Sequence, residues 1–401
     1  MNRSPGGHRV ATAVATSVLV LSTAACGGPA GTNATKPAAT TSAGPGPTSS
    51  VRLTTSTTGG QPHHKGLKRQ RPHGAAHVKR LTRLKRKGRH EAARIVHRAT
   101  LCPLTGLKPR GGRVPQRAAV AVKVENLPEA RPQWGLDKAD IVFEEPVEGG
   151  ITRFIAVFQC QTAAQIEPVR SGRLVDPQIL EPLGRILFGY SGAIQPAIDE
   201  FDSRTSLLDD VGADKSGSAY WRDPARYAPH NLETSTSALY AAAAALRDPE
   251  KPPTAIFSYG KPAPGGTPAA AVSIHDPLDT TTWTWRRDTG IYYRSYSDTG
   301  AALQGDNVQI TASNVIVMLV HERPTPWPED ATGALENELT LKGSGPAWVF
   351  RDGAVYYGTW RRPLLDHPTA FFEQNGTKII LTPGNTWEEL VPRGLDVSVE
   401  P

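Results

Sequence analysis

The first hundred residues contain no aromatic side chain: every Phe, Trp and Tyr of the 401-residue chain lies after residue 100. A segment without aromatic residues buries too little apolar surface to offset the conformational freedom that it loses on folding. The sequence therefore predicts a disordered N-terminal third, here residues 1–100. The remaining part, of about 300 residues, is long enough to build a sizeable hydrophobic core.

Acidic residues are also scarce in this region. Residues 1–60 contain no Asp or Glu, and residues 61–100 carry 13 Lys or Arg against Glu91 alone. The formal net charge of +7 therefore describes neither part of the chain: the basic character belongs to residues 1–100, because residues 101–401 hold more acidic than basic side chains. This distribution excludes a basic globular domain. The lack of a long apolar run beyond the extreme N-terminus excludes a protein that crosses the membrane several times.

The extreme N-terminus has the pattern of an export signal. Met1–Arg9 is positively charged, Val10–Leu21 is apolar, and small residues precede Cys26, so residues 1–25 are predicted to be a lipoprotein signal peptide. Lipidation of Cys26 would anchor the protein to the extracytoplasmic face of the cell membrane. Thr23 occupies the position at which lipoproteins usually carry Leu, so secretion with a free Cys26 is the alternative.

Two further stretches separate this signal from the folded part. Residues 26–64 are rich in Ser, Thr, Pro and Gly, which is typical of a flexible tether. Residues 65–100 are basic, and apolar residues such as Val78, Leu81 and Leu84 recur at helical spacing, which indicates an amphipathic helix. Outside a cell the abundant polyanions are anionic lipids and wall polymers, so we expect this segment to bind one of them. A solvated spacer is the alternative, and nucleic acid is disfavoured.

Cysteine is scarce, with three residues in the chain. Once Cys26 is set aside, Cys102 and Cys160 remain, and in an exported protein they are predicted to form a disulfide. Two buried thiols are the alternative.

Neither CxxC nor HExxH spacing occurs, and no Walker or dinucleotide-binding motif is present. We therefore predict no metal site and no cofactor.

The folded part shows two successive patterns. Over residues 101–250, apolar runs that fit strands alternate with helical segments, which predicts an α/β domain with a mixed sheet. Residues 270–400 contain short strands joined by turns, which predicts a smaller, mostly antiparallel β domain. The predicted helices are 175–183, 194–201 and 237–246, and the predicted strands are 118–124, 141–144, 151–159 and 186–190 in the first domain and 283–287, 291–296, 315–321, 347–350, 355–360, 370–373 and 378–381 in the second.

Charged residues of the α/β part lie among Gly and apolar residues near the predicted strand ends, where α/β sheets bind ligands. The candidate acids and bases are Glu125, Glu144, Glu148 and His230, and the candidate ligand-binding residues are Arg153, Arg170, Arg173 and Asn231. Carboxylates that face each other across a cleft can cleave glycosidic bonds, and arginines can hold a phosphate or carboxylate. Two alternatives stay open: a structural salt-bridge network among these residues, and a His230 that braces its own turn.

Several distinctive motifs occur together in the folded part. They are Cys102-Pro-Leu-Thr-Gly-Leu107, Val124-Glu-Asn126, Arg131-Pro-Gln133, Ala139-Asp-Ile-Val-Phe-Glu144, Val147-Glu-Gly-Gly-Ile-Thr-Arg153, Pro168-Val-Arg-Ser171, Ala228-Pro-His-Asn231, Asn314-Val-Ile-Val317 and Leu381-Thr-Pro-Gly-Asn-Thr-Trp387. Their combination resembles the YerB-like family of bacterial lipoproteins. The resemblance covers residues 101–395. It implies an envelope lipoprotein whose core is a domain of unknown function, so it bears on location and fold and supplies no reaction.

Two functional hypotheses follow. The first is a non-catalytic envelope lipoprotein that binds a wall polymer or an exported partner protein through the polar cleft. The second is an envelope hydrolase or transferase that acts on an anionic glycan, with the carboxylates as acid and base and the arginines as an anion clamp. An open pocket on which the Glu and Arg side chains converge would favour either function. Charges that pair with one another out of water would favour the structural network.

Overall fold

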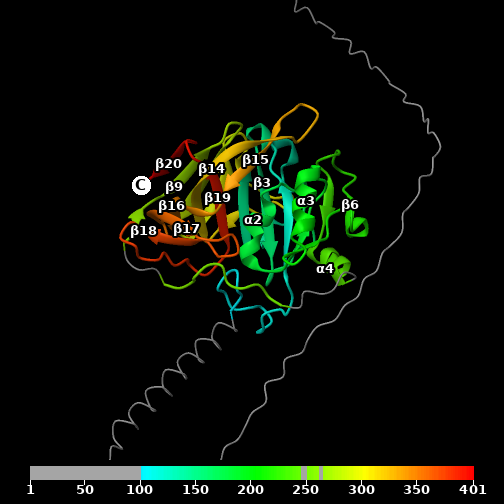
Figure 1. The fold of residues 1–401 in the computed structure, drawn as a ribbon. Helices are drawn as coiled ribbons and strands as arrows, with labels where there is room; N and C mark the ends of the chain where they lie inside the picture. The colour runs from blue at the N-terminus through cyan, green and yellow to red at the C-terminus, as the bar shows by residue number, and fades with distance from the viewer. Residues whose placement is uncertain (1–100, 245–250, 262–264) are drawn as a thin grey trace, which may run out of the picture. The chain divides into compact units, whose positions relative to one another are not determined.

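The computed structural model describes residues 101–244, 251–261 and 265–401 (Figure 1), and the predictions made for residues 1–100 lie outside this range. The elements of the N-terminal half are β1 (Ala119–Glu125), β2 (Ile141–Pro146), β3 (Thr152–Phe158), α2 (Asp176–Leu180), β4 (Ile186–Gly189), α3 (Gln195–Ser203), β5 (Leu208–Asp210), β6 (Tyr220–Arg222), β7 (Leu232–Thr234) and α4 (Thr236–Ala244). Short 3-10 turns occupy Pro128–Ala130, Leu136–Lys138, Glu148–Gly150, Glu181–Leu183 and Gly217–Ala219.

The C-terminal half consists of strands in the part that the structure describes. They are β8 (Thr267–Pro268), β9 (Ala271–His275), β10 (Thr280–Arg286), β11 (Ile291–Tyr296), β12 (Gly300–Ala301), β13 (Thr311–Ala312), β14 (Asn314–Pro328), β15 (Leu335–Thr340), β16 (Gly343–Arg351), β17 (Ala354–Arg362), β18 (Ala370–Glu373), β19 (Thr386–Pro392) and β20 (Val397–Glu400). Most neighbouring pairs among them are antiparallel. The predicted fold class, an α/β part followed by a mostly antiparallel β part, is confirmed.

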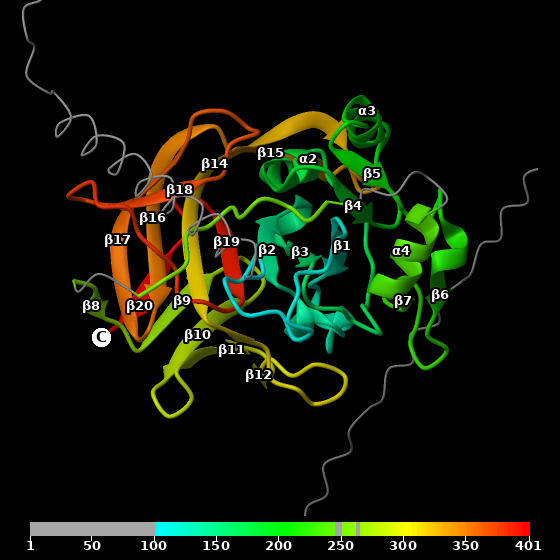
Figure 2. The same cartoon turned by 90° about the horizontal axis from the view of Figure 1, so that it is seen from below.

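One sheet runs through both halves. Its strand order is β18-β17-β16-β14-β19-β2-β3-β1-β4-β5, with β15 paired to β14 and β8 to β17. The junction is β19, which lies parallel to β14 on one side and parallel to β2 on the other. Figure 2 shows β19, near the C-terminus, between the strands of the two halves. A late segment of the chain therefore completes the sheet that the early segments begin.

Both faces of this sheet are covered, and each cover encloses a hydrophobic core. On one face, Val120, Val122 and Trp387 pack with α4 and with a second sheet of order β12-β11-β10-β9-β20. On the other face, Ala119 and Ala121 pack with α2 and α3. Because successive residues of a strand point to opposite faces, a strand covered on both sides needs apolar residues at nearly every position. This explains the continuous apolar runs of β1 and β3.

Two predicted elements differ from the structure. The helix predicted over 175–183 is α2 followed by the 3-10 turn Glu181–Leu183, because Pro182 lacks the amide hydrogen that would continue an α-helix. The segment 378–381, predicted as a strand, makes isolated β-bridges through Lys378 and Leu381.

The structure joins Cys102 and Cys160 by a disulfide, with their Cα atoms 5.9 Å apart. Cys160 comes two residues after the end of β3, so the bond fastens the first described residues to a central strand of the long sheet. The charged residues at Glu125 and Arg153 lie at the opposite end of β1 and β3. Within the described ranges, no helix is long and apolar enough to cross a membrane.

Candidate functional site

The ends of β1, β2 and β3 bring several predicted charged residues to one edge of the sheet. Glu125 ends β1 and lies opposite Arg153 of β3, and Arg153 in turn lies opposite Glu145 of β2. The turn between β2 and β3 adds Glu148. Most of the side chains that precede this edge are apolar and buried, so the charges concentrate where the strands end.

Glu125 holds two partly exposed side chains at this edge. Its own side chain is 1% exposed, with Oε1 lying 3.1 Å from Nε of Arg170 and Oε2 lying 2.9 Å from Nδ1 of His230. Arg170 is positioned by its backbone amide, which donates to the carbonyl of Lys123 in β1. His230 comes from the loop between β6 and β7. A buried carboxylate therefore fixes an imidazole and a guanidinium near the surface.

The outer polar atoms of these two side chains are free. Within the described part of the chain, neither Nη of Arg170 nor Nε2 of His230 makes a hydrogen bond or ion pair, and the two side chains are 26% and 24% exposed. A carboxylate bound to Nδ1 orients an imidazole and leaves Nε2 to bind a ligand or exchange a proton. The two Nη groups can hold a phosphate or carboxylate in bidentate fashion. The arrangement can therefore bind an anion.

Glu148 and Arg173 belong to a largely buried salt-bridge network that also contains Arg153. Glu148 accepts from Nε and Nη2 of Arg173 at 2.9 and 2.5 Å and from Nη2 of Arg153 at 3.1 Å. Arg173 also lies 2.7 Å from Glu329 and 3.6 Å from Glu336, which come from the β14–β15 hairpin. Burial alone would raise the pKa of Glu148, but Arg153 and Arg173 outweigh it and lower that pKa. Burial lowers the pKa of Arg153 to about 10. These predicted site residues therefore pair mainly with one another.

Glu144, predicted as an acid or base, points instead into the core between the two sheets. Its Oε2 lies 2.8 Å from Nη2 of Arg294, and its Oε1 accepts from Thr152 at 2.6 Å and Asn126 at 3.1 Å. A second carboxyl, Glu389, lies 3.3 Å from Nη1 of Arg294. Burial and the neighbouring Glu144 raise the pKa of Glu389. For Glu144, burial is outweighed by the charge of Arg294 together with hydrogen bonds from its neighbours, so the pKa of Glu144 is lowered. Glu144 is therefore a buried ion-pair partner that a ligand cannot reach.

Asn231, predicted as a ligand-binding residue, braces its own loop. Its Nδ2 donates to the carbonyls of Asp223 and Arg226, and its Oδ1 accepts from Nη1 of Arg222 at 2.8 Å. Because both ends of the amide are used, Asn231 orders the loop that carries His230 and does not face the guanidinium of Arg170 as a free donor.

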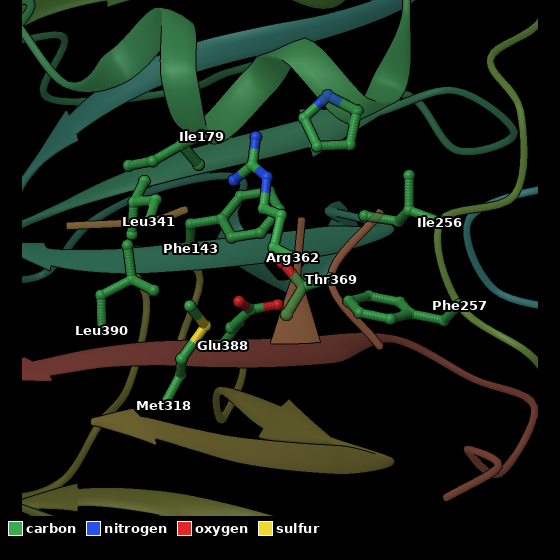
Figure 3. A pocket seen from close by; sticks show the side chains of 11 residues that line it. Phe143, Ile179, Ile256, Phe257, Met318, Leu341, Arg362, Thr369, Glu388 and Leu390 are labelled. Atoms are coloured by element: carbon green, nitrogen blue, oxygen red, sulfur yellow. The ribbon is translucent and has the colours of Figure 1, made fainter. Parts of the chain in front are cut away.

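The structure contains a polar centre that sequence analysis missed, on the sheet face opposite Glu389. Glu388 and Arg362 enter a small pocket whose other walls are mostly apolar (Figure 3): Phe143, Ile179, Pro182, Ile256, Phe257, Met318, Leu341, Thr369 and Leu390. Its cavity of about 20 Å³ has room for about one water molecule. The signal that could have revealed it is a pair of adjacent carboxylates, Glu388 and Glu389, in an otherwise apolar strand.

The two charged groups of this pocket differ in their partners. The carboxyl of Glu388 accepts no hydrogen bond from any of the described residues. Burial raises the pKa of Glu388 to about 7, against the opposing effect of the charge of Arg362. Arg362 donates through Nη2 to the carbonyls of Gln178 and Leu365, and burial lowers its pKa to about 10.

A further buried cation, Lys123, pairs with Glu145 and Asp176. No three His, Cys, Asp or Glu side chains within the described ranges gather as a metal site would require.

Comparison with known proteins identifies the family to which this chain belongs. Two family models, described as "Protein of unknown function (DUF3048) N-terminal domain" and "Protein of unknown function (DUF3048) C-terminal domain", match residues 104–248 and 272–387. The chain is 30% identical over 309 residues to "Putative lipoprotein YerB" of Bacillus subtilis (strain 168), which covers 72% of this chain and 86% of that protein. A crystal structure of YerB protein from Bacillus subtilis aligns with a TM-score of 0.62 and 26% identity, over 75% of this chain and 99% of that one. The chain therefore belongs to the DUF3048 family of proteins of unknown function, which confirms its resemblance to the YerB-like proteins.

Proposed function

We propose that this protein is an exported, membrane-anchored lipoprotein that binds a phosphate or carboxylate group of a wall polymer through Arg170 and His230. The observation that carries the proposal is the state of these two side chains. Both are held by the buried carboxylate of Glu125, and both keep their outer polar atoms free. The anchor rests on the signal pattern before Cys26 and on the name of the related lipoprotein.

The geometry supports an anion as the ligand. Arg170 uses Nε for Glu125, so the end of the guanidinium that carries both Nη groups stays available for two parallel hydrogen bonds to one anionic group. Because the buried Glu125 and the backbone bond to Lys123 already fix Arg170, little side-chain freedom is lost on binding. His230 adds a second donor or acceptor from the neighbouring loop.

The contacts of the other candidate carboxylates favour binding over glycoside cleavage. The usual hydrolytic mechanism needs two carboxyl groups that flank the reacting bond. Glu144 and Glu148 are engaged in buried ion pairs, so neither is free to act beside Glu125. The envelope hydrolase stays as the alternative, with Glu125 and His230 as its reacting pair, and the experiment that tests binding also tests it.

Replacing Arg170 by Ala is expected to weaken binding to isolated wall fragments by at least about tenfold, because charge-assisted hydrogen bonds contribute roughly 1.5–3 kcal/mol each. Co-sedimentation of the full chain with the fragments measures the affinity. Arg185→Ala is the matched control, since Arg185 is also partly exposed and paired with a carboxylate, Asp209, elsewhere in the fold.

The same mixtures are examined by mass spectrometry for altered polymer. Binding that depends on Arg170 and leaves the polymer intact supports the proposal. A new product would replace it with the hydrolase. The proposal fails if the Arg170 and Arg185 variants lose affinity equally, or if the wild-type protein does not bind. The charged residues at the ends of β1, β2 and β3 would then have a structural role only.

A further inference from the structure

A groove lies where the two halves of the described chain meet, and Glu148, the partner of Arg153 and Arg173, is one of the residues that line it. Its walls include Pro146–Ile151 of the β2–β3 turn, Asp276–Pro277 between β9 and β10, and Glu322–Pro324 of the β14–β15 hairpin. Its volume is about 490 Å³, which lies within the usual range of ligand pockets. The site proposed above does not use this groove.

The groove combines apolar walls with an excess of carboxylates. Val147, Ile151, Leu335 and Leu395 supply apolar surface together with four prolines. The acidic side chains in the lining are Glu148, Asp276 and Glu322, against Arg323 as the basic one. Arg323 is already paired with Glu338 at 2.7 Å, so it does not neutralise the groove.

Asp276 is the acidic side chain that lacks a partner. Glu148 is balanced by two arginines, and Glu322 accepts a hydrogen bond from Asn337 at 2.7 Å. In the part that the structure describes, Asp276 makes no hydrogen bond or ion pair. Burial, followed by the neighbouring charges of Glu144 and Asp279, raises the pKa of Asp276 to about 7 against the opposing charge of Arg294. A ligand that brings a cation to this carboxyl would remove the cost of its ionisation.

We propose that this groove binds a peptide segment of another exported protein that carries Lys or Arg between apolar residues. The argument is complementarity of both charge and surface. A cationic side chain would face Asp276 and Glu322, and apolar side chains would pack on Val147, Leu335 and Leu395. An inorganic cation would leave these apolar walls unused. The inference is independent of the proposed anion site, because Glu125, Arg170 and His230 are not among the residues that line the groove.

The test is a fluorescence anisotropy titration of the full chain into a fluorescein-labelled heptapeptide of alternating Lys and Leu. We expect saturable binding that weakens at least tenfold in the double variant Asp276→Asn/Glu322→Gln. The control Asp288→Asn/Asp366→Asn removes the same charge from exposed side chains outside the groove and should stay within twofold of the wild type. Binding by the wild type should tighten between pH 6 and pH 8, as Asp276 loses its proton, and this pH dependence should shrink in the groove variant.

Three outcomes would overturn the proposal. Equal weakening in the groove and control variants would mean that the peptide responds only to net charge. Equally tight binding of a Glu and Leu heptapeptide would exclude recognition of a cation. If a chain that starts at residue 101 binds the peptide but the full chain does not, the occupant of the groove would be the basic segment 65–100 of the protein itself. Circular dichroism melting curves verify that each variant is folded before it is titrated.

Discussion

Replacing Arg294 by Met is expected to destabilise the protein by about 3–5 kcal/mol at neutral pH, because it leaves buried carboxyl groups without their counter-ion. Arg294 is almost completely buried and is paired with Glu144 at 2.8 Å and with Glu389 at 3.3 Å. Its guanidinium also lies over four aromatic rings, those of Phe154, Trp283, Tyr296 and Trp387. Met would fill much of the space but supply neither the charge nor the cation–π contacts.

Urea denaturation at pH 7 measures this loss. The double variant Arg294→Met/Glu144→Gln should recover part of the stability, since it no longer buries an unpaired carboxylate. Arg286→Met is the control, because Arg286 lies on β10 of the second sheet with its side chain 55% exposed, and a change of less than about 0.5 kcal/mol is expected there. A single variant as stable as the wild type would show that the buried cluster does not hold the two sheets together.

Replacing Glu388 by Gln is expected to stabilise the protein above pH 7 by up to about 3 kcal/mol and to have little effect near pH 4. In the folded protein, burial raises the pKa of Glu388 from 4.5 to about 7. A raised pKa means that the folded state binds a proton more tightly than the unfolded state, so its contribution to stability is complete below pH 4.5 and is lost as the pH rises to 7. At about 1.36 kcal/mol per pKa unit, the loss is roughly 3 kcal/mol, and Gln removes it.

The measurement is the free energy of unfolding by urea between pH 4 and pH 8.5, in the wild type and in Glu388→Gln. The difference between the two curves should grow between pH 4.5 and pH 7 and stay constant above. Glu400→Gln removes an exposed carboxylate at the end of the chain and should give a curve parallel to that of the wild type. A Glu388→Gln curve that is also parallel would mean that Glu388 titrates normally in the folded protein.

The sequence predicted the elements whose signals are local. The apolar run from Ala118 to Val124 became β1, the Ala-rich stretch after Ser235 became α4, and the Asp288–Gly290 and Arg351–Gly353 turns each connect two antiparallel strands. Each of these elements is defined by residues that are neighbours in the chain, so propensity and periodicity suffice to find it.

The shared sheet could not be predicted in this way. β19 pairs with β2, almost 250 residues earlier, and no local pattern specifies a partner at that distance. The Glu388–Glu389 pair also hides this strand, because two adjacent carboxylates do not fit the apolar pattern of a strand that is buried on both faces.

The candidate site was predicted only in part, because some of its contacts join residues that are far apart in the chain. Glu125, Arg170 and His230 do come together, and Glu148 does pair with Arg153 and Arg173. The position of Glu144 could not be predicted, because its partner Arg294 lies in the second sheet, 150 residues later. Whether a carboxylate near a strand end faces a ligand or an internal arginine depends on such distant contacts.

The disulfide also decides how a pull on the N-terminal side of the chain would reach the fold. A force applied through the residues before Cys102 passes across the bond to Cys160 and then to the end of β3. That strand is hydrogen-bonded along both edges, to β1 and to β2, so a load along its axis must shear two ladders at once. Without the bond, the same force would peel residues 103–118 away first and open the hydrogen bonds one after another. With the N-terminal anchor proposed above, this single covalent link would give the folded part a mechanically resistant point of attachment.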